Sequence, residues 1–351
     1  MSKTKKKIII CSMQVPFVVG GAELQVANLN AQLLARGYQS TIVNIPFKWY
    51  PKNEIMKHAL VWRILDLSEV DGQKIDLVIG TKFPTYGVRH DNKITWLIHQ
   101  YRQLYDLYLT PFSEFTDSLE DKQIRQMVIN FDNTMLPESK KIYAESKTVA
   151  ARLLQYNNLE SEPLYHPPKH IGRYYCENFE NYILTVNRLE PAKRVDLLIK
   201  SMQYTNPEIR CLIVGQGPEH QTLAKLIDTL NLQDRVQLLG FVDDEKLLEL
   251  YANAGAVFYT PFDEDYGYVT LEAFLSKKPL ITTHDAGGVL EFVKENQSAL
   301  VTKPKAITLG ESINQLISNK KKAQEMGKQG FDSVQYITWD NVIDALTHTL
   351  R

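Results

Sequence analysis

The chain has 351 residues, of which 44% are hydrophobic and 23% are charged, and its formal net charge at pH 7 is −1. This length predicts two domains, each large enough to bury a core of its own. A net charge near zero excludes a general attraction to nucleic acid or to acidic membranes. No apolar run reaches the length of about 18 residues that a membrane-spanning helix needs.

The N-terminus combines lysines with an apolar run, a pattern that signal peptides also show. The run that begins at Ile8 is interrupted by Ser12, Gln14 and Pro16, and no clear small-x-small cleavage site follows. We therefore expect a buried first strand, no export signal and a cytoplasmic protein. The chain's three cysteines have neither metal-ligand nor redox spacing, which agrees with reduced thiols in that compartment. The leading lysines are a candidate for peripheral contact with the inner face of the membrane.

Short apolar runs and amphipathic stretches alternate through the first half of the chain. Glu23–Arg36 gathers leucines and alanines on one face and is followed by Gly37, which predicts a helix. Residues 46–75 and 101–135 are rich in Trp, Tyr and Phe, show no clear period and receive no assignment. The predicted strands are Ile8–Met13, Ser40–Ile45, Leu77–Ile79, Ile94–Ile98 and Ile142–Ala144, and a further helix runs from Ser146 to Tyr156.

A proline-containing segment, Tyr165–His170, interrupts the alternation, which then restarts and ends in a predicted helix over Trp339–Leu350. Two alternating blocks predict two parallel sheets with helices on both faces, and ligands in the cleft at the carboxyl ends of their strands. We predict a first domain over 1–165, a linker over 166–180, a second domain over 181–335, and a final helix in 336–351 that is a candidate to return to the first domain. The predicted strands of the second half are Tyr182–Val186, Cys211–Val214, Val236–Leu239, Ala256–Thr260, Leu280–Thr282 and Ala299–Val301, and its helices are Val195–Met202, Glu219–Leu230, Glu245–Asn253, Tyr266–Ser276 and one near Val289–Val293.

Two groups at predicted strand ends in the first half are candidates for binding. Gly20 and Gly21 follow the first strand and precede a helix, so that backbone there can approach a phosphate or a sugar closely. His99 closes the strand Ile94–Ile98. Each feature also has a structural interpretation, a tight turn for the glycines and a core imidazole for the histidine.

The loop after the strand Tyr182–Val186 carries two cations, Arg188 and Lys193. A planar guanidinium and a compact ammonium, five residues apart at a strand-to-helix junction, suit a diphosphate. Solvated surface charge is the alternative interpretation.

The segment P-F-D-E-D-Y-G-Y-V-T-L-E-A-F, which starts at Pro261, is the most informative stretch of the chain. It places Glu264 and Glu272 on either side of a strand-to-helix junction, where the backbone N–H groups of residues 266–269 form a candidate anion site. Ionised carboxylates only accept hydrogen bonds, so carboxylates beside an anion site favour a ligand that has hydroxyls as well as phosphate. A sugar nucleotide has both. The alternative is that the acidic residues merely complement the helix dipole.

Together, and in this order, these segments resemble the nucleotide-sugar glycosyltransferases of family 4. The family pattern is a Gly-Gly loop, then G-R-L-x-x-x-K-G, E-x-F-G-x-x-x-x-E-A and G-G-x-x-E; this chain has G-G-A-E, N-R-L-E-P-A-K-R, E-D-Y-G-Y-V-T-L-E-A and G-G-V-L-E. The resemblance covers nearly the whole chain and is strongest over residues 180–300. It implies an α/β protein of the GT-B fold, with two facing doubly wound Rossmann-like domains and the active site in the cleft between them. It also implies retaining transfer of a hexose-type sugar from a nucleoside-diphosphate sugar to a glycan or lipid-linked acceptor, in the assembly of cell-envelope polysaccharide.

The resemblance implies a role for each matching residue. Arg188 and Lys193 would hold the donor diphosphate, and Glu264 would hold the hydroxyls of the sugar. Glu272 would hold the ribose hydroxyls, while His99 would orient the sugar near the reacting carbon. Further donor-binding positions are Gly20, Gly21, Gly215, Phe241, Val242, Tyr266, Gly267, Tyr268 and Val269.

Three positions depart from the family pattern. Asn187 replaces a frequent glycine, Tyr266 replaces phenylalanine, and Arg194 replaces the glycine after the lysine, so that Arg194 could reach either phosphate or only solvent. Asp263 and Asp265 match a D-x-D metal motif of another transferase fold. Because Arg188 and Lys193 already supply positive charge, we expect no metal and no cofactor.

The acceptor side has no motif of its own in this sequence. Tyr101, Arg102, Tyr105 and Asp106 are candidates for its wall, although an aromatic patch that covers the core explains them equally well. Other classes of protein stay open as alternatives: a non-catalytic subunit that binds sugar nucleotides, a sugar-nucleotide epimerase, and a glycosidase.

Overall fold

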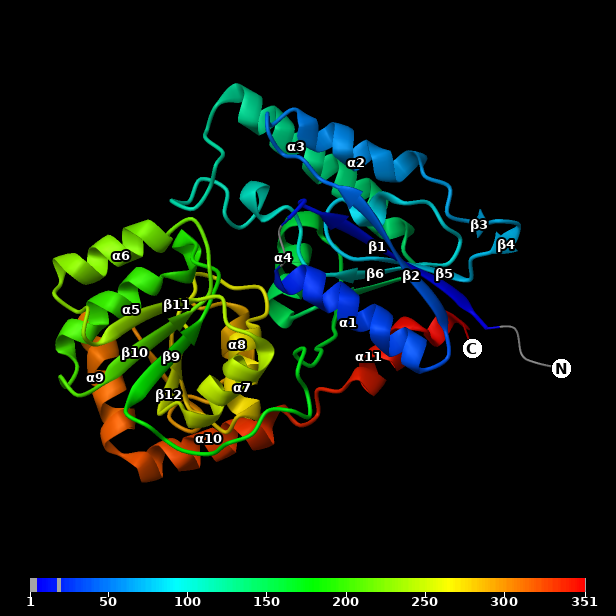
Figure 1. Ribbon diagram of the computed structural model, residues 1–351. Coiled ribbons are helices and arrows are strands. Elements are labelled where there is room, and N and C mark those ends of the chain that lie inside the picture. Colours follow the sequence, from blue (N-terminus) through cyan, green and yellow to red (C-terminus); the bar gives the residue numbers. More distant parts are fainter. Residues whose placement is uncertain (1–4, 18–19, 351) are drawn as a thin grey trace. The chain divides into compact units, whose positions relative to one another are not determined.

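The computed structural model describes residues 5–17 and 20–350. Lys3, the first of the N-terminal lysines, therefore lies outside the described residues. The chain forms two compact units (Figure 1), one made of residues 1–169 together with 337–351 and the other of residues 170–336. Each unit has a six-stranded parallel sheet, as predicted from the alternation of apolar runs. Among the described residues, no helix is long and apolar enough to cross a bilayer.

The first unit places its strands in the order β2-β1-β5-β6-β7-β8. The helices α1 and α11 pack on one face of this sheet, and α2, α3 and α4 pack on the other (Figure 1). The elements are β1 (Lys7–Gln14), α1 (Gly21–Ala35), β2 (Gln39–Pro46), α2 (Glu54–Ile64), the antiparallel hairpin β3 (Glu69–Val70) and β4 (Gln73–Lys74), β5 (Leu77–Gly80), β6 (Lys93–Leu97), α3 (Leu119–Met135), β7 (Lys141–Ala144), α4 (Lys147–Asn157), β8 (Glu162–Pro163) and α11 (Trp339–Leu346).

The second unit has the strand order β11-β10-β9-β12-β13-β14. The helices α5, α6 and α9 cover one face of the sheet, whereas α7 and α8 lie on the other side (Figure 1). The elements are β9 (Tyr182–Val186), α5 (Val195–Ser201), β10 (Arg210–Val214), α6 (His220–Thr229), β11 (Val236–Gly240), α7 (Asp244–Asn253), β12 (Ala256–Phe258), α8 (Tyr268–Leu275), β13 (Leu280–Thr283), β14 (Ala299–Thr302), α9 (Ala306–Ser318) and α10 (Lys320–Val334).

The two stretches that received no assignment contain regular structure. Residues 46–75 hold α2 and the β3–β4 hairpin, and residues 101–135 hold α3. The helix α3 begins where the Ser118 hydroxyl accepts a hydrogen bond from the Asp121 N–H at 3.1 Å, which is a side-chain N-cap. Phe47, Tyr105, Phe115 and Phe131 of these stretches are buried in the core of this unit.

Two predicted helices of the second unit need correction. The helix predicted from Tyr266 begins at Tyr268, because Gly267 has a φ of 88° and acts as the N-cap. The helix predicted near Val289–Val293 is a single 3-10 turn over Gly288–Glu291.

The C-terminal helix α11 belongs to the first unit. Its residues Trp339, Val342, Ile343 and Leu346 are buried in the same cluster as the strands β1, β5 and β6 and the helix α1. The Tyr38 hydroxyl also donates to Thr347 at 3.2 Å, so the end of the chain closes one face of the first sheet.

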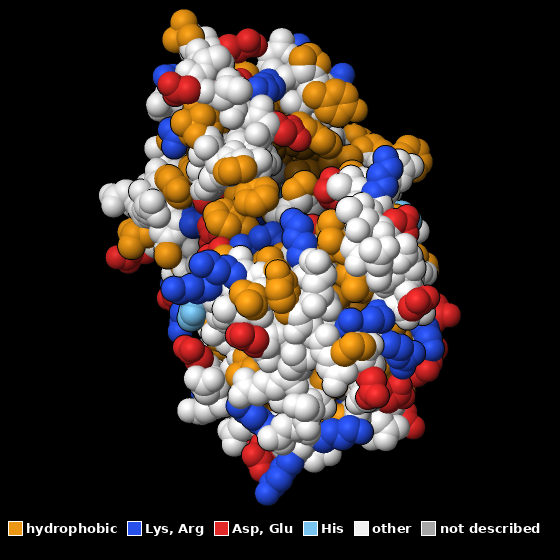
Figure 2. All heavy atoms as spheres, turned by 90° about the vertical axis from the view of Figure 1, so that its left-hand side faces the viewer, with side chains coloured by type: hydrophobic (Ala, Val, Ile, Leu, Met, Phe, Trp, Pro, Cys, Tyr) orange, Lys and Arg blue, Asp and Glu red, His pale blue; other side chains and the backbone are white. Residues whose placement is uncertain are grey.

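Over the face drawn in Figure 2, Lys and Arg side chains are interspersed with Asp and Glu side chains, in agreement with a net charge of −1.

Candidate functional site

The second sheet reverses its strand order between β9 and β12, which are neighbours although they lie far apart in sequence. In open parallel sheets, ligands bind outside the carboxyl ends of the strands at such a switch point. The loop after β9 carries Arg188 and Lys193, and the loop after β12 carries Glu264. The topology therefore collects three of the predicted site residues at one edge of one sheet.

Lys193 and Glu264 form an ion pair at this edge, with 2.6 Å between Nζ and a carboxylate oxygen. Their side chains are 20% and 18% exposed, so both can still be reached by a ligand. An ammonium group has three N–H donors, and Glu264 takes one of them. Arg188 lies in the same loop, is about half exposed, and pairs with Glu190 at 2.8 Å.

The Glu264 loop is held in place by the glycine pair Gly287 and Gly288. The Gly288 N–H donates to the Glu264 carbonyl at 2.7 Å, and Gly287 forms a parallel bridge with Glu264. A Cβ on Gly287 would lie 2.5 Å from the Glu264 carbonyl oxygen, and one on Gly288 would lie 2.3 Å from that of Asp265. The late G-G-x-x-E motif is therefore needed here for close backbone contact with the loop that presents Glu264.

The helix α8 starts directly after this loop. Its N-cap is Gly267, so the N-terminus has no capping side chain from that residue, and its first N–H groups include those of Tyr268 and Val269. The Tyr266 ring is buried against Phe292 and Tyr268, with ring centroids 5.3 and 5.4 Å apart. The tyrosine that replaces the family's phenylalanine thus fills a core position.

Arg194 has a structural role that the sequence left open. Its backbone has a φ of 52°, a left-handed conformation that explains why the family pattern has glycine here. The guanidinium donates to the Thr260 and Pro261 carbonyls at 2.7 Å, to Thr283 Oγ1 at 2.9 Å and to both Asp285 carboxylate oxygens at 2.8 Å. Arg194 therefore ties the loops after β12 and β13 together and does not point only into solvent.

The other donor-side positions lie at neighbouring strand ends. Gly215, with a φ of 129°, packs so closely on the preceding loop that a Cβ would lie 1.8 Å from the Asn187 carbonyl oxygen. Backbone packing also explains the second glycine of the sequence Gly215-Gln216-Gly217. The Leu189 N–H donates to the Gln216 carbonyl at 3.0 Å, and a Cβ on Gly217 would lie 2.5 Å from the Leu189 carbonyl oxygen. Phe241 is 77% exposed after β11, and Val242 follows it.

Glu272 lies on α8 and is held by two tyrosines. Tyr251 Oη donates to one carboxylate oxygen at 2.6 Å, and Tyr174 Oη donates to the other at 3.3 Å. Burial raises the pKa of the Glu272 carboxyl, and the two hydroxyl donors act in the opposite direction. Neither tyrosine was predicted from the sequence, because each is far from Glu272 along the chain.

The first sheet has its own switch point, between β1 and β5. Gly20 is the N-cap of α1, and its N–H donates to the Glu23 carboxylate at 2.8 Å. Lys82, which follows β5, pairs with Glu23 at 2.8 Å and is 8% exposed. Although burial opposes it, Lys82 holds the pKa of Glu23 below its usual value. Lys82 was missed in the sequence, although its place directly after a buried strand was a usable signal.

His99 follows β6, and its Nδ1 lies 2.6 Å from the Gln100 carbonyl oxygen. The four acceptor-side candidates have two different environments. Tyr105 is a core residue, 2% exposed, whose hydroxyl donates to the buried Asp132 at 2.6 Å, which leaves no ring surface for an acceptor. Arg102 and Asp106 pair with each other at 2.7 Å, and Tyr101 packs against the core aromatic rings.

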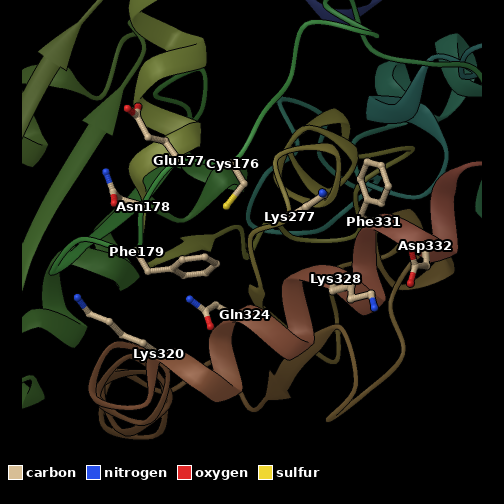
Figure 3. Close-up of a pocket in the computed structure, with 10 residues that line it drawn as sticks. All are labelled: Cys176, Glu177, Asn178, Phe179, Lys277, Lys320, Gln324, Lys328, Phe331 and Asp332. Atoms are coloured by element: carbon tan, nitrogen blue, oxygen red, sulfur yellow. The ribbon is translucent and has the colours of Figure 1, made fainter.

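A pocket of about 560 Å³ lies elsewhere in the second unit (Figure 3). It is lined from the segment 176–179, from Lys277 after the C-terminus of α8, and from α10. An eight-residue helix is about 12 Å long, so this pocket and the Glu264 loop lie at opposite ends of α8. It is therefore separate from the candidate site.

Comparison with known proteins adds a family to this geometry. Residues 177–333, nearly all of the second unit, match the family described as Glycosyl transferases group 1. The second unit is a glycosyl transferases group 1 domain. The site residues Arg188, Lys193, Glu264 and Glu272 all lie within the matched residues.

One curated relative is the poly(ribitol-phosphate) alpha-N-acetylglucosaminyltransferase of Staphylococcus aureus, 26% identical over 176 residues, which are 49% of this chain and 34% of that protein. The chain spans about a third of the length of the first curated relatives that it matches.

Solved structures match the group 1 domain together with the first unit. Sucrose-phosphate synthase from Thermosynechococcus elongatus matches with a TM-score of 0.79 at 17% identity, over 97% of this chain and 98% of that one. Anabaena HepE, in complex with UDP and glucose, matches with a TM-score of 0.70 at 19% identity, over 97% and 99% of the two chains. The likeness confirms the predicted GT-B fold.

Proposed function

We propose that the protein is a glycosyltransferase that moves a hexose-type sugar from a nucleoside-diphosphate sugar to a hydroxyl of a glycan or lipid-linked acceptor. The observation that carries the proposal is the Lys193–Glu264 pair at the switch point of the second sheet. It joins an ammonium group, which has N–H donors beyond the one that Glu264 takes, to a carboxylate that can accept hydrogen bonds from sugar hydroxyls. The group 1 family match and the UDP bound by Anabaena HepE support this choice and make UDP the first donor base to test.

The proposed reaction is a substitution at the anomeric carbon of the donor sugar. The bond between the anomeric carbon and the diphosphate oxygen breaks as the bond from that carbon to the acceptor oxygen forms. The leaving diphosphate departs toward Arg188, Lys193 and the N-terminus of α8, whose charges are already in place. Its phosphate oxygen takes the acceptor's proton on the same face of the sugar, so that the anomeric configuration is retained. His99 orients the sugar.

Metal independence is part of the proposal. Two cations in one loop supply the positive charge that a divalent ion supplies in other transferases. Asp263 and Asp265, the alternative metal ligands, flank Glu264 in its loop, and Asp265 is buried.

The acceptor is proposed by analogy with relatives. The name of the Staphylococcus aureus relative gives poly(ribitol-phosphate) as its acceptor, which supports the proposal of an acceptor in cell-envelope polysaccharide assembly. We propose that the protein works in the cytoplasm and contacts the inner face of the membrane peripherally.

A transfer assay tests the proposal. The purified protein is incubated in EDTA with UDP-sugars and with a set of glycan and lipid-linked acceptors, and the product is analysed by NMR. The expected result is acceptor-dependent transfer with the donor's anomeric configuration kept. An inverted product, or activity that needs Mg²⁺ or Mn²⁺, would contradict the mechanism, and release of an epimerised sugar would indicate an epimerase.

A further inference from the structure

Three side chains from separate parts of the second unit meet at Glu272. Glu272 comes from α8, Tyr251 from α7, and Tyr174 from the segment that precedes β9. The two tyrosine rings lie edge to face, with centroids 6.3 Å apart and an interplanar angle of 82°. Tyr251 is fully buried, so its hydroxyl is fixed in position before any ligand arrives.

The Glu272 carboxylate accepts one hydrogen bond from each of the two tyrosines. Each tyrosine donates to a different oxygen of Glu272, at 2.6 Å for Tyr251 and 3.3 Å for Tyr174. A carboxylate has about four acceptor positions, so two remain after both tyrosines have bonded. The two tyrosines hold the plane of the Glu272 carboxylate in place. Its two remaining acceptor positions suit a ligand that has two neighbouring hydroxyl groups.

We propose that Tyr251 and Tyr174 are positioning residues that orient Glu272 to accept hydrogen bonds from the two ribose hydroxyls of the donor nucleotide. The inference rests on the proposed function, because it assigns the ribose to Glu272. Neither tyrosine touches the reacting atoms. Tyr251 lies on α7, whereas Tyr174 lies outside the strands and helices of the second unit.

Through Tyr174, the proposed ribose recognition depends on the first residues of the second unit, before β9. Its ring contacts that of His170, with centroids 6.2 Å apart, and His170 Nε2 lies 3.2 Å from Asp244 at the start of α7. The same short segment thus contacts α7 and supplies a donor to α8.

Charge gives the inference a second readout. Burial raises the pKa of Glu272, and a hydroxyl donor to the carboxylate lowers it. Removing the Tyr251 hydroxyl therefore raises that pKa further. A protonated carboxyl has lost acceptor capacity, so nucleotide affinity should fall as the pH is lowered and Glu272 takes up a proton. In Tyr251→Phe this fall should begin at a higher pH than in the wild type.

Calorimetric titration tests the inference. The probes are UDP, GDP and ADP and their 2′,3′-dideoxy counterparts, and the quantity compared is the affinity ratio between the nucleotide that binds and its dideoxy form. We expect Tyr251→Phe to reduce this ratio by roughly tenfold and Tyr174→Phe to reduce it less, because its hydrogen bond is longer. Tyr38→Phe is the matched control, since that hydroxyl donates to Thr347 Oγ1 at 3.2 Å in the first unit. It should lower the melting temperature and leave the ratio unchanged.

The outcomes separate the inference from the proposed function. If Glu272→Gln abolishes the preference while Tyr251→Phe and Tyr174→Phe retain it, the tyrosines do not position the carboxylate and the function stands. If the wild type binds a nucleotide but does not distinguish its dideoxy form, Glu272 does not hold the ribose and the inference is overturned. If no nucleotide binds to the wild type, both the proposed function and the inference are contradicted.

Discussion

The two units share one architecture but place their charged groups differently. In the second unit, Lys193 and Glu264 stand at the carboxyl edge of the sheet, partly exposed and paired with each other. In the first unit, Lys93 and Asp132 are fully buried among hydrogen-bond partners. Lys93 donates to the Tyr86 carbonyl at 2.8 Å, and the Tyr86 hydroxyl donates to Asp132 at 2.6 Å. Lys193 and Glu264 thus stand at the proposed ligand site of the second unit. In the first unit, Lys93 and Asp132 lie in the core, and a further cation–carboxylate pair, Lys82 with Glu23, lies at the edge of the sheet.

The largest effect is expected from Lys193→Ala. This change removes one of the two cations proposed to stabilise the leaving diphosphate, so turnover should fall by about a hundred- to a thousandfold. Steady-state kinetics measures the loss, and circular dichroism checks that the fold survives. Lys200→Ala is the matched control, because Lys200 forms an exposed pair with Asp196 at 2.7 Å away from the site. Normal turnover in Lys193→Ala would remove the diphosphate assignment.

Gly287→Ala should give the next largest effect, on both stability and activity. The φ of 63° opposes a side chain, and the new Cβ would collide with the Glu264 backbone. Gly37→Ala in the first unit isolates the effect of φ alone, because Gly37 has a φ of 86° and a Cβ added there would meet no atom within 4 Å. We expect Gly37→Ala to lower the free energy of unfolding by about 1–2 kcal/mol and Gly287→Ala to lower it by more. Equal values in chemical denaturation would show that the Glu264 loop adapts.

Arg194 allows the loop contacts to be separated from backbone strain. Arg194→Ala loses the five guanidinium hydrogen bonds and keeps the left-handed backbone unfavourable, whereas Arg194→Gly loses the same bonds but relieves the strain. We expect both variants to be less stable than the wild type, with Arg194→Gly about 1 kcal/mol more stable than Arg194→Ala. Thermal unfolding measures the order. A wild-type melting temperature in Arg194→Ala would contradict the structural role.

The last effect concerns pH and tests the buried Asp132 of the first unit. Burial raises the pKa of Asp132 to about 7, although the Tyr86 and Tyr105 hydroxyls oppose the shift. Between the ordinary carboxyl pKa and about 7, the folded protein therefore binds a proton that the unfolded chain has lost. Its stability contribution is complete below that range and is lost as the pH rises through it. Asp132→Asn should thus lose less stability than the wild type between pH 5 and pH 8, and an unchanged pH dependence would contradict the shift.

The sequence predicted the strands of both units better than the helices, because α2 and α3 in the first unit and α9 and α10 in the second received no assignment. Strands such as β9 and β10 are short apolar runs that end at polar residues or glycine, so their period and limits are both visible. The helices α2 and α3 each carry a single Trp or Phe, namely Trp62 and Phe131, and the other aromatic residues of these stretches lie in the segments before each helix. A window that mixes such a segment with a helix shows no clear period. The Ser118 cap of α3 was a readable signal that the aromatic content hid.

Site residues that belong to a short motif could be predicted from the sequence, whereas contacts between residues far apart in the chain could not. Arg188, Lys193 and Glu264 could be predicted to lie at one sheet edge because each belongs to a short motif at a strand end. Tyr174 and Glu272 are 98 residues apart, and no local pattern links them. The role of Arg194 also depends on residues that are 66 to 91 positions away along the chain.

In the proposed function, Lys193 and the α8 junction bind a nucleoside diphosphate without metal. The most direct measurement is calorimetric titration of the protein with UDP, GDP and ADP in EDTA, for the wild type and for Lys193→Ala. We expect one nucleotide to bind to the wild type in EDTA and to bind at least roughly tenfold more weakly to the variant. Binding that appears only after Mg²⁺ or Mn²⁺ is restored, or that is equal in the two proteins, would contradict it.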